Sequence, residues 1–360
     1  MTEFLLKWIR PEIRALSAYQ VAGADGMVKL YAMENPYALP QAHRDDWVNK
    51  VAAAEINRYP DAGARELKAV IKSLMQPPAG SAMLLGNGSD EIIQMLALAV
   101  AQPGRCIMAF EPGFVMYRMI AEFTGMQYVG VPLDDNFEID VVKTLRLIDQ
   151  HQPAIIFIAY PNNPTANCFQ RAAIDQLIQF APGLVVIDEA YHPFAQDSYM
   201  DALVQHEKLL VMRTVSKMGL AGLRLGVLFG HPLLINEIDK LRLPYNINVL
   251  TQQAASAILR QPQALEQQAA AIREQRTAML RQLAGLPQLT VYPSQANFIL
   301  FRLHGVSADT VFNSLKQQGV LIKNMSAAGG ALDNCLRVTV GMEEENAVFM
   351  RALLKAVNSE

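Results

Sequence analysis

A lysine that could act as a nucleophile follows one of the apolar segments of the chain. Lys217 stands in RTVSKMGLAGLRLG (213–226), next to Ser216 and upstream of Arg224. A lysine attacks a carbonyl only after losing its proton, and a partly buried, cation-rich site favours that loss. Thr214, Ser216 and Arg224 are hydroxyl and guanidinium donors that suit a phosphate dianion. The segment predicts a carbonyl-binding lysine beside a phosphate site, although a solvated surface lysine would carry the same short motif.

A carboxylate ends a second apolar segment. Asp188 closes the apolar part of VVIDEAYHPF (185–194). A carboxylate at the end of a buried strand can bind a metal, a ribose hydroxyl or a ring nitrogen, or it can cap the following helix. The six histidines are scattered along the chain, which argues against a metal site. Facing a pyridine nitrogen, Asp188 would keep that nitrogen protonated and make the ring an electron sink.

Two loops rich in turn residues complete the set. In AYPNNPTAN (159–167), the amide of Asn163 could donate to a phenolate-type oxygen, although Asn-Pro pairs are also ordinary turn formers. In GNGSDEII (86–93), glycines precede Ser89 at a predicted helix N-terminus, where backbone N–H groups suit a phosphate. Ser89 could equally be a plain N-cap, with Asp90 in the first turn. The loop has neither the Walker nor the dinucleotide-binding pattern.

The lysine and the asparagine each follow a predicted strand, and the aspartate closes the apolar part of another. Short runs apolar on both faces alternate with helical patterns, which predicts an α/β fold with a mainly parallel sheet and helices on both faces. Strands are predicted at 105–110, 127–131, 154–160, 184–190, 209–216 and 225–230, with helices at 139–150 and 171–181. Ligands of such sheets bind at the carboxyl ends of the strands, so we expect these side chains to lie close together.

The last third of the chain predicts a different architecture. Residues 248–285 are rich in Gln, Ala, Leu and Arg, which suits one or two long helices. Strands are predicted at 289–293, 297–303, 320–324 and 335–341, with helices around 307–318 and 343–358. We therefore predict three parts: an N-terminal segment (1–40) packing with the small domain, a large domain (41–250), and a small α+β domain (251–360) entered through the long helical stretch.

Composition narrows the possible partners. The 360 residues are 51% hydrophobic and 18% charged, which excludes a disordered chain. A net charge of -3 and a pI near 6.1 provide no basic surface for nucleic acid or an anionic membrane. No uninterrupted apolar run reaches the length of a membrane span or a signal-peptide core. Cys106, Cys168 and Cys335 are too far apart for a disulfide framework or a metal pair, so a cytoplasmic protein is expected.

The order of these motifs resembles that of the fold type I pyridoxal-phosphate enzymes, the class I and II aminotransferases. A Gly/Ser loop is followed by an aromatic loop, an Asn-Pro turn, a strand-end Asp, and a Ser-Lys pair with a downstream Arg. The resemblance covers nearly the whole chain, from about residue 15. It implies a pyridoxal 5'-phosphate cofactor, a large domain built on a mainly parallel seven-stranded sheet, a smaller α+β domain, and a homodimer.

The resemblance implies a role for each motif residue. Lys217 is similar to the lysine that carries the cofactor covalently, and Asp188 to the partner of its ring nitrogen. Asn163 and Tyr191 resemble the pair that binds the phenolic oxygen of the cofactor. Phe114 lies where the family stacks an aromatic ring on it. The implied phosphate-binding group comprises the backbone of Gly88 and Ser89 together with Asp90, Thr214, Ser216 and Arg224.

Several segments resemble the histidinol-phosphate aminotransferases within this family. They are LSAYQV (16–21), LYAMENPY (30–37), NRYPD (57–61), GNGSDE (86–91), PYNINVLTQ (244–252) and GVLIKN (319–324). The resemblance implies that Tyr59 reaches the cofactor phosphate of the neighbouring subunit. It also implies that Arg337 clamps the substrate α-carboxylate, unless this arginine is merely a strand residue facing solvent. The residues implied to shape the imidazole-phosphate pocket are Tyr19, Asn35, Tyr245 and Lys323.

Three residues depart from the family pattern. Met33 stands where many relatives have Asn, and Ala166 replaces the usual Gly after NNPT. Lys323 stands where Arg is common. This third departure matters most, because Lys323 is implied to recognise a substrate phosphate. Lys323 is therefore either a phosphate ligand or a solvated strand end.

The expected activity is transfer of an amino group between L-histidinol phosphate and 2-oxoglutarate, a step of histidine biosynthesis. Three alternatives share the fold: an aromatic amino acid aminotransferase, a threonine-phosphate decarboxylase-like lyase, and a cofactor-binding sensor of the kind found in transcription regulators. The negative net charge disfavours the sensor, because such a protein must bind DNA. The expected partners are small-molecule substrates and a second copy of the chain, with no nucleic acid, membrane or metal.

Overall fold

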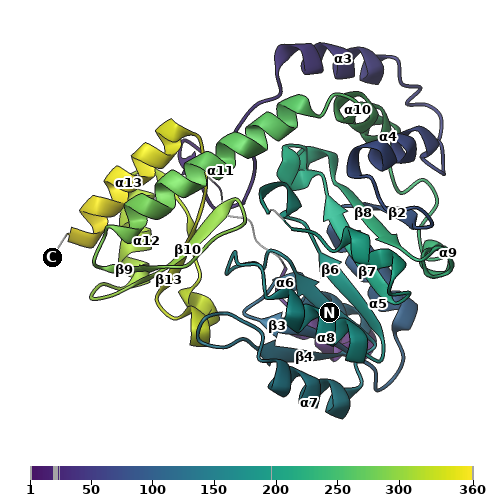
Figure 1. Cartoon of the computed structure of the whole chain (residues 1–360), viewed down its shortest axis with the longest axis horizontal. Helices are drawn as coiled ribbons and strands as arrows, with labels where there is room; N and C mark the ends of the chain where they lie inside the picture. Colours follow the sequence, from purple (N-terminus) through teal and green to yellow (C-terminus); the bar gives the residue numbers. More distant parts are fainter. Residues whose placement is uncertain (1, 19–22, 24, 196, 359–360) are drawn as a thin grey trace.

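The computed structural model describes residues 2–18, 23, 25–195 and 197–358, and it contains two main sheets. The larger sheet has seven strands and lies in the right half of Figure 1, and the smaller sheet lies at the left. Helix α11 (Gln263–Ala284) runs from the first part toward the second. Within these described ranges, no helix combines the length and the apolar composition needed to cross a membrane.

The large sheet has the strand order β2-β8-β7-β6-β5-β3-β4. Its strands are β2 (Ala82–Asn87), β3 (Cys106–Glu111), β4 (Gln127–Pro132), β5 (Ile155–Ala159), β6 (Leu184–Asp188), β7 (Leu209–Thr214) and β8 (Leu225–Gly230). Strands β4, β3, β5, β6 and β7 pair in parallel, and β8 is antiparallel to both of its neighbours, β7 and β2. The predicted mainly parallel sheet is confirmed. Strand β2 was not predicted, and it runs in the same direction as β7.

Helices cover both faces of this sheet, so its strands are apolar throughout. One face packs against α5 (Ser89–Val100), α6 (Val115–Thr124) and α9 (Pro232–Asp239). The other packs against α4 (Arg65–Met75), α7 (Val141–His151), α8 (Arg171–Phe180) and α10 (Val249–Leu259). Successive strand residues alternate between the two cores: in β7, Leu210 and Met212 belong to the first core, and Leu209 and Val211 to the second.

The smaller sheet has the order β12-β13-β10-β9. Its strands are β9 (Leu289–Val291), β10 (Phe298–Leu303), β12 (Lys323–Asn324) and β13 (Cys335–Thr339), and its helices are α12 (Ala308–Gln317) and α13 (Glu343–Asn358). The prediction of one strand over 320–324 was wrong in detail. Strand β11 (Val320–Leu321) pairs with β1 (Val28–Lys29) of the N-terminal segment, and the chain joins β13 only at β12. One apolar run therefore serves two different partners.

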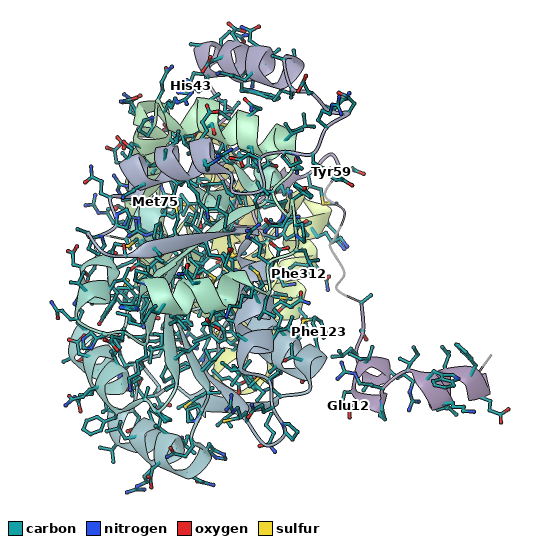
Figure 2. All side chains as sticks on the ribbon, turned by 90° about the vertical axis from the view of Figure 1, so that its right-hand side faces the viewer. Glu12, His43, Tyr59, Met75, Phe123 and Phe312 are labelled. Atoms are coloured by element: carbon teal, nitrogen blue, oxygen red, sulfur yellow. The ribbon has the colours of Figure 1, made fainter. Side chains whose placement is uncertain are left out.

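The N-terminal segment contacts both parts of the molecule. Helices α1 (Thr2–Trp8) and α2 (Pro11–Ala15) project from the body in Figure 2, where Glu12 lies close to Phe123 of α6. The guanidinium of Arg10 donates to the backbone carbonyl of Phe123. Farther along, Leu30 is buried in the core of the small sheet, and α3 (Gln41–Ala52) packs on α10. The boundaries drawn at residues 40 and 250 stay predictions.

Several of the loops between strands contain short 3-10 helices. They are η1 (His192–Phe194), η2 (Met200–Val204), η3 (Ser216–Met218), η4 (Ala221–Leu223), η5 (Ser326–Ala328) and η6 (Gly330–Leu332).

Strand β8 passes so close to the loop before α5 that it has no room for a side chain at Gly226. A Cβ there would lie 2.7 Å from the carbonyl carbon of Gly88 and 2.8 Å from the nitrogen of Ser89. We expect Gly226→Ala to lower the free energy of unfolding by about 1–3 kcal/mol, the usual cost of overpacking, in a urea titration. The control Gly222→Ala, whose Cβ meets nothing within 4 Å, should change it little. Equal losses would contradict this close approach.

Candidate active site

A cavity at the carboxyl edge of the large sheet gathers most of the predicted residues. It encloses about 140 Å³ and is lined by Met33, Ser89, Asp90, Phe114, Ala159, Pro161, Asn163, Asp188, Ala190, Tyr191, Thr214, Ser216, Lys217 and Arg224. Most of these residues stand in the loops that follow β2, β3, β5, β6 and β7. These strands share one direction, so their loops meet although they are far apart in sequence.

Lys217 lies in turn η3, directly after β7. Its Nζ lies 5.6 Å from the centre of the Tyr191 ring. Burial lowers the pKa of Lys217 to about 8, and the positive charges of Arg337 and Arg224 act in the same direction. Near pH 8 the neutral and charged amines are therefore about equally populated. The site thus supplies the neutral amine that attack on a carbonyl requires.

Asp188 is the last residue of β6, and it is buried. Burial raises the pKa of Asp188 to about 6, although hydrogen bonds from Tyr117 and from the Ala190 backbone oppose this increase. The Tyr117 hydroxyl donates to Oδ2 at 2.7 Å, and the Ala190 N–H donates to Oδ1 at 3.0 Å. The carboxylate stays mostly ionised at neutral pH, so it can face a protonated ring nitrogen.

Sequence reasoning missed Tyr117. This residue is fully buried, its ring stacks on Phe157 at a centroid distance of 4.6 Å, and it meets Phe114 edge-on at 5.4 Å. The sequence did contain a signal for it: Tyr117 stands three positions after Phe114, and residues three positions apart on a helix lie on the same side. Since Phe114 immediately precedes α6 and points into the cavity, Tyr117 is placed one turn further along.

Asn163 connects the two sheets. Its Nδ2 donates to the Tyr191 hydroxyl at 3.3 Å, and its Oδ1 accepts from Nη1 of Arg337 at 2.5 Å. Arg337 is a buried residue of β13, so the small sheet contributes a guanidinium to the edge of the large one. Burial raises the pKa of Tyr191 and keeps it protonated. Its hydroxyl also contacts the sulfur of Met33 at 3.3 Å.

The opposite end of the cavity is built to hold an anion. Gly88 caps the 12-residue helix α5, which begins at Ser89 and directs its free N–H groups into the cavity. Arg224 lies against this cap, paired with Asp90 at 3.3 Å. A Cβ on Gly88 would lie only 2.6 Å from the Arg224 Nη2, so the absence of a side chain makes the approach possible. The hydroxyl groups of Thr214 and Ser216 lie 2.8 Å apart beside it.

These features fit the cofactor that the sequence resemblance implies, pyridoxal 5'-phosphate. Its phosphate suits the helix N-terminus together with Ser89 and Arg224. Its ring nitrogen suits the Asp188 carboxylate, and its phenolic oxygen suits the donors of Asn163. Its aldehyde suits the amine of Lys217. The residues present thus match each polar group of the cofactor, and they come from four separate loops.

Four of the predicted residues lie elsewhere, and one is not described. Tyr59 is 79% exposed and stacks on Tyr245 at 4.4 Å; neither lines the cofactor cavity in the described part of the chain. Asn35 donates to the backbone carbonyl that follows the site lysine, at 3.2 Å, from outside the cavity. Lys323 is exposed on β12, in register with the strand that carries the buried arginine. Tyr19 lies outside the described residues.

Comparisons with known proteins agree with this arrangement. The family model for aminotransferase class I and II matches residues 25–353, and the chain belongs to this family. It is 51% identical over 347 residues to histidinol-phosphate aminotransferase 2 of Nitrosococcus oceani, covering 96% of each chain. It is 49% identical over 357 residues to histidinol-phosphate aminotransferase 1 of Ralstonia nicotianae, covering 98% of this chain and 95% of the relative.

A solved structure shares the fold. The histidinol-phosphate aminotransferase of Sinorhizobium meliloti, in complex with pyridoxal-5'-phosphate, superposes with a TM-score of 0.84 at 22% identity, covering 98% of each chain.

The buried Asp188 carboxylate should destabilise the cofactor-free protein at neutral pH. Its pKa rises from 3.8 to about 6 on folding, so the cost is absent well below pH 4 and fully present above pH 6. We expect Asp188→Asn to be more stable than the wild type by less than about 1 kcal/mol at pH 4 and by about 3 kcal/mol above pH 7. Urea unfolding across this range measures the difference. A difference that does not depend on pH would contradict the assignment.

Proposed function

We propose that the chain is a pyridoxal-phosphate-dependent transaminase that transfers an amino group between L-histidinol phosphate and 2-oxoglutarate in histidine biosynthesis. The observation that carries the chemistry is the cavity in which Lys217, with its lowered pKa, shares one site with the buried Asp188. The choice of substrate is supported by full-length relatives named histidinol-phosphate aminotransferases.

Each residue of the cavity has a separate task. The bound cofactor supplies an electron sink for the carbon that loses its proton. Nζ of Lys217 accepts that proton from the α-carbon of the amino donor, which its pKa of about 8 permits near neutral pH. Asp188 holds a negative charge beside the ring nitrogen. Asn163 is fixed by Arg337 and by the Tyr191 hydroxyl, so its amide is oriented before any ligand arrives.

The two substrates place different demands on one site. Glutamate and 2-oxoglutarate carry an α-carboxylate, which suits the buried guanidinium of Arg337, because arginine can bind a carboxylate with two parallel hydrogen bonds. Histidinol phosphate lacks a carboxylate and carries a phosphate, which requires its own partner. Lys323 faces Arg337 in the β12–β13 register and is exposed. Its flexible side chain suits an anion present in only one of the two substrates.

Replacing Lys323 should affect phosphorylated donors selectively. We expect Lys323→Met to lower kcat/KM for histidinol phosphate. The loss should correspond to about 1.5–3 kcal/mol of transition-state stabilisation, the value of a hydrogen bond to a charged group, and kcat/KM for phenylalanine should stay unchanged. Lys316→Met, at an exposed lysine of α12, is the matched control and should leave both values unchanged. Equal losses with both donors would make Lys323 a structural residue.

The donor itself is tested by a direct comparison. Purified enzyme is assayed with histidinol phosphate, phenylalanine and threonine phosphate, using 2-oxoglutarate as acceptor. The proposal predicts the highest kcat/KM for histidinol phosphate and no release of carbon dioxide from threonine phosphate. Preference for phenylalanine would instead establish the aromatic aminotransferase, and carbon dioxide release would establish the lyase.

We also propose that the enzyme is a homodimer in which Tyr59 acts on the cofactor phosphate of the other subunit. Tyr59 is exposed and stacks on Tyr245. In Figure 2 it lies on the upper right of the main body, the side from which the N-terminal helices project. Those helices carry Phe4, Leu6 and Trp8 with more than half of their surface exposed. Apolar side chains gathered on one side support contact with a second subunit.

Hybrid dimers test this arrangement. A Tyr59→Phe subunit is combined with a Lys217→Ala subunit, and the heterodimer is isolated by two affinity tags. If Tyr59 acts across the interface, one site carries both substitutions and the other carries neither. The hybrid should then keep about half of the wild-type activity per dimer and one cofactor site of normal affinity. If Tyr59 acted within its own subunit, one site would carry only Tyr59→Phe and the other only Lys217→Ala. The activity per dimer would then be about half that of the Tyr59→Phe homodimer.

We further propose a cytoplasmic location. Cys106, Cys168 and Cys335 are all unpaired, and the first and last are buried. Burial raises the pKa of Cys168 to about 12, so its thiol is unreactive. Unpaired thiols of this kind suit a reducing compartment.

A further inference from the structure

A buried ion pair lies behind the two loops that carry Asp188 and Lys217. Glu189 follows Asp188, and Arg213 precedes Thr214. Because side chains alternate along extended backbone, Glu189 and Arg213 point to the opposite side of the sheet from the cofactor cavity. They line a second cavity of about 440 Å³, of which Thr214 is the shared wall.

Hydrogen bonds hold both members of the pair in place. Glu189 and Arg213 are 1% and 7% exposed. Nε and Nη2 of Arg213 donate to Oε2 of Glu189 at 2.9 and 2.8 Å, and Nη2 also donates to the Ser198 hydroxyl at 2.8 Å. The Ser198 hydroxyl and the Tyr199 N–H donate to Oε1 at 2.9 and 2.6 Å. Both carboxylate oxygens are thus occupied, and the Arg213 guanidinium is held in one orientation.

The ion pair lies where backbone pairing stops. The register between β6 and β7 ends at Asp188 opposite Met212, and the Glu189 N–H donates to the Met212 carbonyl at 2.8 Å. Glu189 and Arg213 are the next residues after this last pair, Glu189 after β6 and Arg213 in β7. Beyond them, the chain leads to Tyr191 on one side and to Lys217 on the other. The Glu189–Arg213 contact therefore ties the start of the loop after β6 to the end of strand β7, just beyond the final β6–β7 pair and just before the loop that carries Lys217.

We propose that Glu189 and Arg213 are positioning residues, which fix the loop of Asp188 and Tyr191 relative to the loop of Ser216 and Lys217. The pair touches no reacting atom. Stability alone is a weak reason for it, because a buried ion pair can often be replaced by apolar residues without loss of stability. Orientation is a stronger reason. Nε and Nη2 of the planar Arg213 guanidinium both donate to one carboxylate oxygen, Oε2 of Glu189, and the two bonds together fix the distance and angle of the contact.

The consequence of losing the pair should be kinetic. Misplacement of a reacting group by about 1 Å can lower a rate about 100-fold. Removing only one partner leaves an unpaired buried charge, which destabilises the protein. An effect of loop geometry on kcat could then not be separated from an effect of stability. The informative variant is therefore the double substitution Glu189→Gln/Arg213→Met, which removes both charges and keeps similar volumes. Arg213→Lys is the second variant, because it keeps the charge and loses the two-bond geometry.

The experiment measures steady-state kcat and KM with histidinol phosphate as donor and 2-oxoglutarate as acceptor. The first half-reaction with L-glutamate is followed separately, by the absorbance change of the cofactor-loaded enzyme. We expect both variants to lose about 10- to 100-fold in kcat with KM changed less than about threefold. Two further readouts accompany the kinetics: the visible circular dichroism of the bound cofactor should change, and amide exchange should accelerate in residues 189–199 and 214–220. The inference rests on the transaminase function proposed above, and a wild type inactive with both donors would reject that function instead.

The control for stability is Leu177→Ala, a fully buried residue of α8 that is distant in sequence from both loops. It should lower Tm and leave kcat and circular dichroism unchanged. A double variant with wild-type kcat, circular dichroism and exchange would overturn the proposal. So would a loss of kcat shared equally with Leu177→Ala. Should the double variant not fold, Arg213→Lys decides by the same readouts, and wild-type values in it would overturn the proposal.

Discussion

The active site depends on burying ionisable groups in a protonation state that suits the chemistry. Burial lowers the pKa of Lys217 and raises that of Asp188, so the same lack of water helps the first group and opposes the second. The structure offsets the opposed effect with two hydrogen bonds to the carboxylate, from Tyr117 and from a backbone N–H. For the amine, the charges of Glu34 and Asp90 offset the effect of burial only in part, so the pKa of Lys217 stays lowered to about 8. Function is thus obtained from a local loss of stability.

Sheet topology makes this arrangement possible. Strands β2, β5, β6 and β7 run in one direction, so the loops after them open on the same edge. Helix α5 begins at that edge and presents its N-terminus to the cavity, while β13 of the small sheet contributes Arg337. The anion end, the carboxylate end and the amine are therefore supplied by separate elements. Among the ion pairs of the part of the chain that the structure describes, Glu189–Arg213 has the least exposed side chains, and we have proposed that it fixes the relative position of two of these elements.

The sequence predicted those parts of the site that directly follow apolar strands. Lys217 and Asn163 were placed in loops and Asp188 at the end of a strand, because a continuous apolar run precedes each of them. Strand β2 was missed because its residues, AMLLGN, include no β-branched or aromatic side chain and contain a glycine. The Tyr117 contact was missed because a buried tyrosine within a helix looks like ordinary core. The position of Tyr59 could not be derived, because its proposed partner belongs to a second subunit.

The most direct test of this account is the pKa of Lys217 in the cofactor-free protein. The rate at which pyridoxal 5'-phosphate becomes covalently attached depends on the fraction of neutral amine, so its pH dependence reports that pKa. The account predicts a midpoint of about 8, shifted from 10.5 by burial and by the nearby guanidinium groups. A midpoint near 10.5 would show a solvated lysine and contradict the buried site on which the proposed chemistry depends.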